Sequence, residues 1–458
     1  MALNLEQEKL RTLHPMPAQI ESGDLMVDDV HTIHYRVYGN IKAKKTALFL
    51  HGGPGAGCFP NHARFFDPAR WRVVLFDQRG CGSSTPKGCE VNNDTPHLIS
   101  DIELLRKKID GGVCGPVPAW DVVLGGSWGV TLALAYAQKH PDKVRGIILR
   151  GVCTMRAKEI CWLFGPEGGA SSLNPRGYKD FVSELTDEER RKCHTVLEAF
   201  RARLFSPDEK VRSRAASRWS SWEGSMSSLS YSFSPASAET ITVPGTVINA
   251  GEGVANMTQL ASEGLAYNVL TNSSVGSVNK TKGTPDSGGA VVQWDGRRWL
   301  VDGRDELQLQ QEAQDRFRKR VASRSATHAI AASTTAANST TGGAGNASSA
   351  ASPMSGWVPA QAMLTCFYSL HGGFVTEGQL MEKENVDRIR HIPCVAVQGA
   401  ADLICPPGTA LDLHEAWPEM RLVLVGGAGH SMYDPKITHE LVKATDSFFS
   451  SWDGSNTF

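Results

Sequence analysis

The pentapeptide at residues 125–129, Gly-Gly-Ser-Trp-Gly, carries a serine that could act as a nucleophile. It follows the apolar run 120–124 and precedes the helix-forming segment 130–137. This pattern predicts a strand, a tight turn and a helix, which would expose the Ser127 hydroxyl at the carboxyl end of a sheet. Glycines suit such a turn because strand and helix backbones approach so closely that a Cβ would collide. A chance G-x-S-x-G is the alternative in a chain with 45 glycines, but the flanking patterns favour a nucleophile elbow.

Two later residues could activate this serine. A serine hydroxyl is a weak nucleophile at neutral pH, so a histidine must take its proton and a carboxylate must orient that histidine. Asp402 and His430 each follow an apolar strand pattern near the C-terminus. We therefore expect Ser127, Asp402 and His430 to form a triad at one sheet edge, in the chain order nucleophile, acid, histidine. Asp434 and His439 are the nearest substitutes, but Asp434 comes after His430 and fits the start of a helix better.

The oxyanion formed during nucleophilic attack needs hydrogen-bond donors that are already in place. We expect one donor to be the backbone N–H of Trp128, directly after the serine. The other is expected from Gly53 in the loop 51–55, His-Gly-Gly-Pro-Gly, after the strand pattern 46–50. A phosphate-binding loop is the alternative, but the G-K-S/T of such a loop does not follow. The segment 77–84 is expected to be scaffold, with charged groups that tie loops together beside the site.

Short apolar runs alternate with helical patterns in two parts of the chain. These runs are 46–50, 72–76, 120–124, 144–149, 394–398 and 421–425. Continuous apolar strands that alternate with helices predict an α/β fold with a mostly parallel sheet covered on both faces. Residues 1–151 and 387–458 are expected to form this core, split by a long insertion.

The insertion, residues 152–386, is predicted to be a helical cap over the site. Residues 186–189 fit a capping box that opens one helix through Phe205, and Ser206-Pro207 fits the start of another. From about residue 230 to residue 357 the composition turns to small polar residues, which predicts disorder. Within that stretch, 291–301 has the Asp-Gly turn of a hairpin. Residues 284–289 are similar to the nucleophile segment of chymotrypsin-like proteases, but no matching histidine segment precedes them.

The composition of the chain limits which partners and cofactors we expect. The 458 residues are 41% hydrophobic and 21% charged, with a formal net charge of -1 and no long basic stripe, which argues against nucleic acid or an anionic membrane as the main partner. No apolar run has the length of a signal peptide or the roughly 18 residues of a membrane span, so we expect a cytoplasmic protein. The ten cysteines lack C-x-x-C spacing. We therefore expect reduced thiols and no metal or other cofactor, while the oligomeric state stays open.

Four segments, taken in order along the chain, resemble the prolyl aminopeptidases, also called proline iminopeptidases. They are 51–55, 77–83, 125–129 and 429–431, and the resemblance extends over about 13–230 and 360–458. It implies an α/β-hydrolase fold with a helical cap inserted after strand six. It also implies release of N-terminal proline from short peptides through an acyl-enzyme, without a metal. Ser127 would be the nucleophile, His430 the base and then the acid, and Asp402 the orienting carboxylate.

The same resemblance assigns two residues to the substrate pocket. Glu223 matches a glutamate that binds the substrate amine, and a buried cationic amine requires a nearby carboxylate. A solvated helix residue is the alternative for Glu223. Cys405 matches a thiol that lines the proline pocket, with a simple buried cysteine as the alternative.

Three positions depart from the family pattern. Thr365 stands where a glutamate is usual, and Cys153 and Leu163 stand where aromatic residues often pack on the pyrrolidine ring. These departures predict an amine held by one carboxylate and a weaker selectivity for proline. The leading hypothesis is a serine exopeptidase. An esterase, amidase or lactonase of the same fold is the first rival, and a catalytically silent binding protein is disfavoured because every triad and oxyanion position is filled.

Overall fold

The computed structural model describes residues 10–110, 115–191, 193–228 and 359–451, together with short strands between residues 242 and 305. The chain divides into two compact units, one made of Met1–Tyr231 with Thr340–Phe458 and the other of Ser232–Ser339. Of the helices in these described residues, none is long and apolar enough to cross a membrane.

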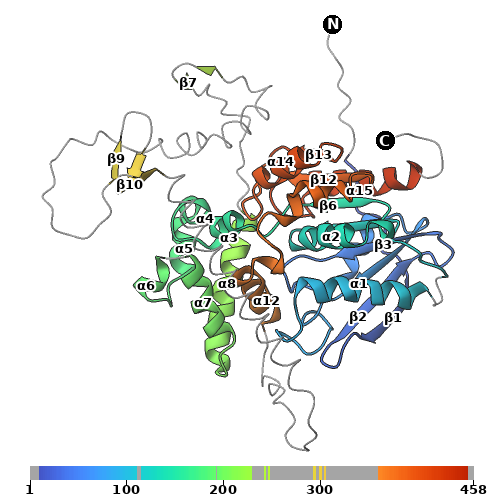
Figure 1. The fold of residues 1–458 in the computed structure, drawn as a ribbon, viewed down its shortest axis with the longest axis horizontal. Coiled ribbons are helices and arrows are strands. Elements are labelled where there is room, and N and C mark those ends of the chain that lie inside the picture. The colour runs from blue at the N-terminus through green and yellow to red at the C-terminus, as the bar shows by residue number, and fades with distance from the viewer. Residues whose placement is uncertain are drawn as a thin grey trace, which may run out of the picture. The chain divides into compact units, whose positions relative to one another are not determined.

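Eight strands of the first unit form one sheet (Figure 1). In chain order they are β1 (Gln19–Met26), β2 (Thr32–Gly39), β3 (Lys45–Leu50), β4 (Trp71–Phe76), β5 (Val122–Gly126), β6 (Ile147–Arg150), β12 (Cys394–Gly399) and β13 (Arg421–Val425). Their order across the sheet is β1-β2-β4-β3-β5-β6-β12-β13. The strands from β4 to β13 are mutually parallel, whereas β2 pairs antiparallel with both β1 and β4. The predicted mostly parallel α/β fold is confirmed, and its strand ends share one edge.

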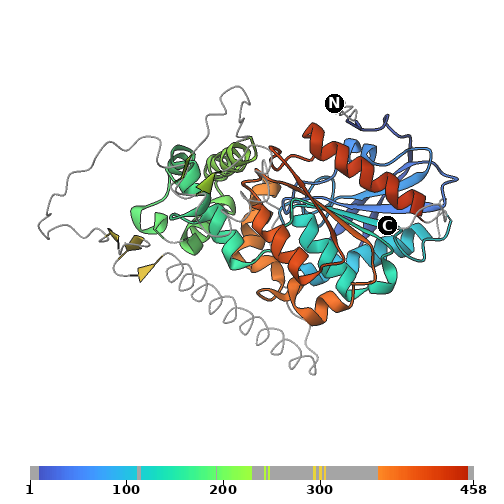
Figure 2. The ribbon, with the colours of Figure 1, turned by 90° about the horizontal axis from the view of Figure 1, so that it is seen from above.

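Helices cover both faces of this sheet, as Figure 2 shows. On one face lie α1 (Thr95–Asp110) and α2 (Trp128–Lys139), while α15 (Pro435–Ser451) lies on the other. Near β13 the chain also forms α14 (Pro407–Ala416). Strands with helices on both faces are mostly apolar, and every residue of β4, β5, β6 and β12 is buried.

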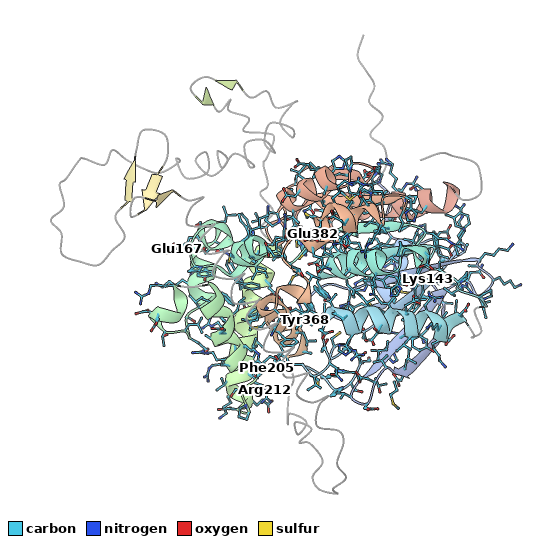
Figure 3. The ribbon with its side chains drawn as sticks, in the orientation of Figure 1. Lys143, Glu167, Phe205, Arg212, Tyr368 and Glu382 are labelled. Atoms are coloured by element: carbon cyan, nitrogen blue, oxygen red, sulfur yellow. The ribbon has the colours of Figure 1, made fainter. Side chains whose placement is uncertain are left out.

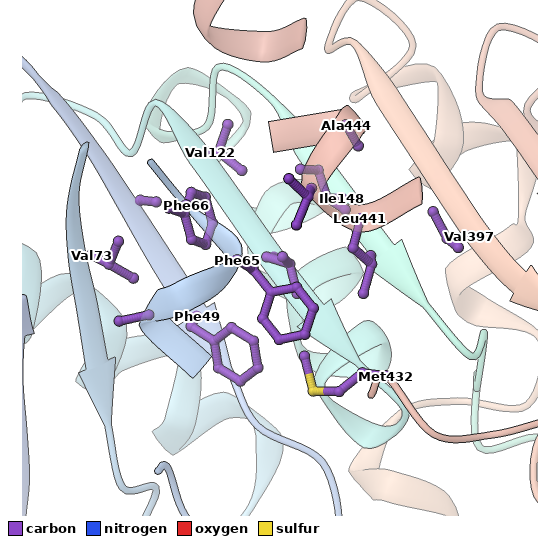
Figure 4. Packing of buried hydrophobic residues seen from close by; sticks show 14 of the residues in the cluster. Phe49, Phe65, Phe66, Val73, Val122, Ile148, Val397, Met432, Leu441 and Ala444 are labelled. Atoms are coloured by element: carbon purple, nitrogen blue, oxygen red, sulfur yellow. The ribbon is translucent and has the colours of Figure 1, made fainter. Parts of the chain in front are cut away.

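The hydrophobic core beneath α15 joins the two parts of the chain that form the sheet. Phe49 and Val122 from the N-terminal part pack in one cluster with Val397 and Leu441 from the C-terminal part (Figure 4). The short 3-10 helix η1 (Pro60–Phe65) adds Phe65. Full burial of each such side chain contributes about 1.5–3 kcal/mol, so the cluster holds the strand ends in a common frame.

Helices make up most of the described part of the first unit between β6 and β12. They are α3 (Ala157–Phe164), α4 (Gly169–Leu173), α5 (Pro175–Phe181), α6 (Asp187–Arg190), α7 (Cys193–Leu204), α8 (Glu209–Ser228), α12 (Ala360–Leu370) and α13 (Lys383–Asp387). Two short 3-10 helices, η5 (Gly372–Phe374) and η6 (Gln379–Met381), separate α12 from α13. A further 3-10 turn, η2 (Pro141–Lys143), precedes β6. Of these helices, α12 packs against α7 and α8.

Two predicted helix boundaries in this region are wrong. The helix expected from the capping box through Phe205 is divided into α6 and α7, because the N–H of Arg191 bonds to the Glu188 carbonyl three residues back, a tighter turn that ends α6. The next helix, α8, begins after Asp208 rather than at Ser206-Pro207. There the Asp208 carboxylate accepts the N–H of Lys210 at 2.8 Å.

An aromatic cluster holds these helices together. Phe181 stacks on Phe200 with ring centroids 4.4 Å apart, and Trp219 packs against Phe164 at 4.8 Å. The indole of Trp222 donates to the Leu163 carbonyl at 3.0 Å, which ties α8 to α3. Because Glu223 is next to Trp222, this cluster also fixes where Glu223 lies.

In the second unit, β7 (Thr242–Val243) pairs with β8 (Thr246–Val247), and β10 (Trp299–Val301) pairs with β9 (Val292–Trp294) and β11 (Arg304–Asp305). The antiparallel register of Trp294 opposite Trp299 confirms the two strands of the predicted hairpin. The rest of the stretch predicted to be disordered, including 284–289, lies outside the described residues.

Candidate active site

Ser127 occupies a sharp turn between β5 and α2. Its backbone has φ of 56° and ψ of -124°, a conformation that costs a non-glycine residue about 1–3 kcal/mol and that the surrounding structure must hold in place. A Cβ at Gly125 would lie 2.2 Å from the carbonyl oxygen of Gly129, and one at Gly129 would lie 2.1 Å from that of Leu50. Only glycine fits at these two positions, which explains the motif in terms of packing.

Asp402 and His430 lie side by side at the ends of β12 and β13. The distance between His430 Nδ1 and Asp402 Oδ2 is 2.8 Å. The other carboxylate oxygen, Oδ1, accepts the backbone N–H groups of Ile404 at 3.0 Å and Cys405 at 2.9 Å. Asp402 is only 1% exposed, so these contacts replace its hydration. A carboxylate held on Nδ1 leaves Nε2 as the nitrogen that can accept a proton.

The Ser127 hydroxyl and His430 are not directly paired in this structure. Among the described residues, the hydrogen-bond partner of Ser127 Oγ is the Cys405 thiol, with 3.9 Å between Oγ and Sγ. His430 Nε2 instead faces Arg150 Nη1 at 3.2 Å. Proton transfer from Ser127 to His430 therefore requires Arg150 to release Nε2. Catalytic hydrogen bonds of substrate-free sites commonly tighten only when substrate binds.

Arg150 is a site residue to which the sequence analysis assigned no role. It ends β6, and its Nη1 also donates to the backbone carbonyl of His430 at 2.9 Å. Burial lowers the pKa of its guanidinium, and the nearby Asp402 carboxylate opposes that shift. Arg150 thus holds the loop that carries His430. A charged residue at the end of an otherwise apolar strand was the signal for this role.

Gly151 makes the space that His430 occupies. Its φ is +61°, and a Cβ there would lie 3.1 Å from His430 Cε1 and 3.4 Å from Asp402 Oδ2. We expect Gly151→Ala to displace the imidazole and lower kcat by about 10-fold to 100-fold, since small misplacements of catalytic groups carry such losses. Gly378→Ala is the matched control, because Gly378 also has a positive φ of +77° but no atom within 4 Å of an added Cβ.

Both variants are expected to lose about 1 kcal/mol of folding free energy from the left-handed backbone alone. Thermal unfolding measures that shared loss, and initial rates measure the loss specific to position 151. Equal kcat values for the two variants would show that a methyl group at position 151 does not disturb catalysis.

A cavity of about 70 Å³ opens beside Ser127. It is lined by residues of the elbow, of the loops after β3, β6 and β12, and of the helices between β6 and β12. Those that the sequence singled out are Ser127, Trp128, Gly53, Glu223, Cys405, Cys153, Leu163 and Thr365. Asp402 and His430 are not among the lining residues. The described residues contain no group of three or more His, Cys, Asp or Glu side chains placed to hold a metal ion.

The two expected oxyanion donors border this cavity. Trp128 is the first residue of α2, so its backbone N–H has no carbonyl partner within the helix. Its indole ring packs edge-on against Tyr368 of α12, with centroids 4.7 Å apart, and Figure 3 labels Tyr368. Gly53 has φ of +112°, and a Cβ there would lie 2.6 Å from the backbone nitrogen of Gly55. The loop 51–55 therefore needs glycine at Gly53.

Glu223 lies on α8 and lines the cavity with a partly buried side chain. Burial raises the pKa of its carboxyl to about 7, and the Trp219 indole opposes that shift. A nearby cation would favour the ionised form. Glu159 also lines the cavity, but its Oε1 accepts from Arg156 Nε at 2.7 Å. Of these two carboxylates, Glu223 is therefore the one suited to a cationic ligand.

Thr365, which stands where the resemblance places a glutamate, contacts the loop 51–55. Its hydroxyl donates to the Pro54 carbonyl at 2.9 Å. This bond ties α12 to the loop 51–55. It also means that the Thr365 hydroxyl already donates its proton to a protein acceptor. The cavity therefore offers a substrate amine the carboxylate of Glu223 without a second one at position 365.

Cys405 lies next to Ser127 but is held as a neutral thiol. A hydrogen bond with the Cys153 thiol and burial raise the pKa of Cys405 well above its ordinary value. The thiolate is the reactive form of cysteine, so this environment disfavours Cys405 as a nucleophile.

The elbow, the strand ends and the sheet define the class of this protein. Residues 46–166 match the family described as alpha/beta hydrolase fold, and the structure is an α/β hydrolase. The chain is 33% identical over 440 residues to a probable proline iminopeptidase of Leptolyngbya boryana. The aligned residues cover 96% of this chain and 97% of that protein. It is 32% identical to the proline iminopeptidase of Arabidopsis thaliana, over 95% of this chain and 82% of that one.

A proline iminopeptidase of Xylella fastidiosa (strain 9a5c) is also 32% identical, over 96% of this chain and all of that protein. The chain belongs to the proline iminopeptidase family, and it is an enzyme, a hydrolase of the prolyl aminopeptidase class.

Proposed function

We propose that this enzyme is a serine exopeptidase that releases N-terminal proline from short peptides through an acyl-enzyme. The observation that carries the proposal is a single cavity that has both Ser127 and the carboxylate of Glu223 in its lining. Ser127 would attack the first peptide bond while Glu223 binds the cationic amine of the same residue. The proposed reaction needs no metal or other cofactor.

The proposed cycle has two halves. In the first, His430 takes the Ser127 proton, Asp402 stabilises the imidazolium, and the backbone N–H groups of Trp128 and Gly53 bind the oxyanion. His430 then gives the proton to the leaving peptide amine, which departs as the serine ester forms. In the second half, water attacks that ester with His430 as the base, and the free amino acid leaves.

The helices between β6 and β12, which we propose as a cap formed by residues 152–386, explain why an exopeptidase is favoured. Glu223 on α8 and Leu163 on α3 line the same cavity as Ser127. A small cavity with a carboxylate in its wall favours one residue with a free amine over the middle of a chain. Short peptides are therefore the proposed substrates.

An esterase, amidase or lactonase is the second candidate function. It is favoured by the apolar cavity wall, which has Cys153 and Leu163 in places where the family often has aromatic residues, and by Thr365, whose hydroxyl is engaged by Pro54. Such a pocket would suit an uncharged acyl group.

Matched substrates separate the two candidates. We expect the prolyl arylamide to be cleaved with a kcat/KM about 100-fold higher than the N-acetylprolyl arylamide, because only the first carries a charge for Glu223. Initial rates for both amides, and for a simple aryl acetate, test this. Brisk acetate hydrolysis without turnover of the prolyl arylamide would favour the esterase.

A further inference from the structure

Gln78 is hydrogen-bonded to both segments that carry the expected oxyanion donors. It follows β4, the neighbour of β3 in the sheet, and is only 3% exposed. Its side-chain Nε2 donates to the His51 carbonyl at 3.0 Å, and its Oε1 accepts from the Trp128 indole Nε1 at 2.9 Å. Its backbone N–H lies 3.1 Å from His51 Nε2. Three hydrogen bonds thus join Gln78 to the start of the Gly53 loop and to the residue after Ser127.

The orientation of this amide is set by its partners. The His51 carbonyl can only accept a hydrogen bond and the Trp128 indole can only donate one, so Nε2 and Oε1 of Gln78 cannot exchange places. A primary amide is the side chain that presents both a donor and an acceptor at its end. The three polar groups are buried, so loss of either bond would leave a polar atom without water.

We propose that Gln78 is a positioning residue of the oxyanion hole. Gly53 follows β3 and Trp128 follows β5, and the Gln78 side chain bridges the two segments. Oxyanion donors work within a narrow window of about 2.7–3.1 Å from the developing charge. A bridge that sets the spacing of the two segments therefore controls how well both N–H groups reach one oxygen. The inference rests on the proposed function, because it takes Ser127 as the nucleophile.

Gln78 is not among the residues that line the cavity. Its replacement should therefore affect KM and kcat differently. Substrate binding depends on Glu223 and the cavity wall, so KM should change little. The oxyanion exists only in the transition state and the tetrahedral intermediate, so kcat should fall. A substitution that merely loosened the fold would instead lower thermal stability without this separation.

Gln78→Glu keeps the acceptor for Trp128 and loses the donor to His51, and Gln78→Met loses both. We expect kcat to fall by about 10-fold for the first and about 100-fold for the second, since complete loss of one oxyanion donor costs about 100-fold to 1000-fold and a displaced donor costs less. KM should stay within about twofold of wild type. Binding of a prolyl boronic acid, which mimics the tetrahedral intermediate, should weaken in proportion to kcat.

Gln138→Met is the matched control. Gln138 is 4% exposed, and its Nε2 donates to the Leu380 carbonyl at 2.8 Å, but it does not line the cavity. The Gln138→Met variant should have a lower unfolding temperature and an unchanged kcat. Trp128→Phe, which keeps the backbone N–H and removes the indole N–H, breaks the same bridge from its other end. If Gln78 acts partly through that indole, Gln78→Met and Trp128→Phe together should cost less than the product of their separate effects.

Each assay is run with the prolyl arylamide and with an aryl acetate. A wild-type enzyme that cleaves only the acetate would overturn the proposed function, and the effect of Gln78 on acetate turnover would still test the bridge. The positioning role is wrong if Gln78 variants keep kcat within twofold, or if KM and kcat change together and boronate binding does not.

Discussion

Replacement of Ser127 by alanine is expected to lower kcat for the prolyl arylamide by about a millionfold, because the group that forms the acyl-enzyme is gone. Initial rates with the purified variant measure the loss. Ser171→Ala is the matched control, since the Ser171 hydroxyl also makes a hydrogen bond, from its Oγ to the Gly168 carbonyl at 2.7 Å, but Ser171 does not line the cavity. It should keep the wild-type rate.

The opposite result would point to the neighbouring thiol. Cys405 Sγ lies 3.9 Å from Ser127 Oγ. If Ser127→Ala retained a large fraction of activity while Cys405→Ala lost it, the nucleophile would be Cys405. We expect Cys405→Ala to change substrate preference, because Cys405 lines the cavity, and to retain the serine chemistry.

Replacement of Glu223 by glutamine is expected to lower kcat/KM for the prolyl arylamide by about 100-fold to 1000-fold, because a buried cationic amine would lose its carboxylate. The same change should leave aryl acetate hydrolysis close to wild type. Glu159→Gln is the matched control among the carboxylates of the cavity. The Glu159 carboxylate is already bound by Arg156, so its loss should affect stability more than the preference for a free amine.

The pH dependence of kcat/KM in the wild type also follows from Glu223. The pKa of Glu223 is raised to about 7 by burial, so the carboxyl is neutral below that pH and charged above it. Binding of a cationic amine needs the charged form. We therefore expect kcat/KM for the prolyl arylamide to rise more steeply through pH 7 in the wild type than in Glu223→Gln. Matching profiles for the two proteins would remove Glu223 from amine recognition.

The change Glu223→Gln is expected to raise stability at high pH, although it lowers activity. A carboxyl whose folded pKa is raised contributes stability at low pH that is lost as the pH rises through about 7. Glutamine cannot ionise, so Glu223→Gln should unfold at a higher temperature than the wild type at about pH 8.5 and at a similar temperature at about pH 4, below the ordinary pKa of a glutamate. This measurement also shows that the variant's loss of activity is not a loss of fold.

Sequence patterns were sufficient to predict the sheet and the strand-end positions of the candidate site. Asp402 and His430 could be placed because each follows a continuous apolar strand, and the structure brings the two within hydrogen-bond distance. The close approach of β5 and α2 at Gly125 is likewise encoded in local residue types. Such features depend on short segments, where spacing and side-chain type carry the information.

Contacts between distant segments could not be predicted in this way. The bridge from Gln78 to Trp128 and His51, the approach of Arg150 to His430, and the bond from Thr365 to Pro54 each join segments that are far apart in the sequence. Gln78 stood within a segment expected to be scaffold, and only its geometry indicates a link to the oxyanion donors. The division into α6 and α7 depends on one tight turn at Arg191 that no composition signal marked.

The most direct test of the account is to trap the acyl-enzyme. The wild-type protein is mixed with an activated prolyl ester, quenched in acid within the turnover time, digested and analysed by mass spectrometry. We predict that the peptide containing Ser127 gains the mass of one prolyl group and that Ser127→Ala shows no such gain. A prolyl group on Cys405 instead, or rapid turnover with no adduct at Ser127, would contradict the account.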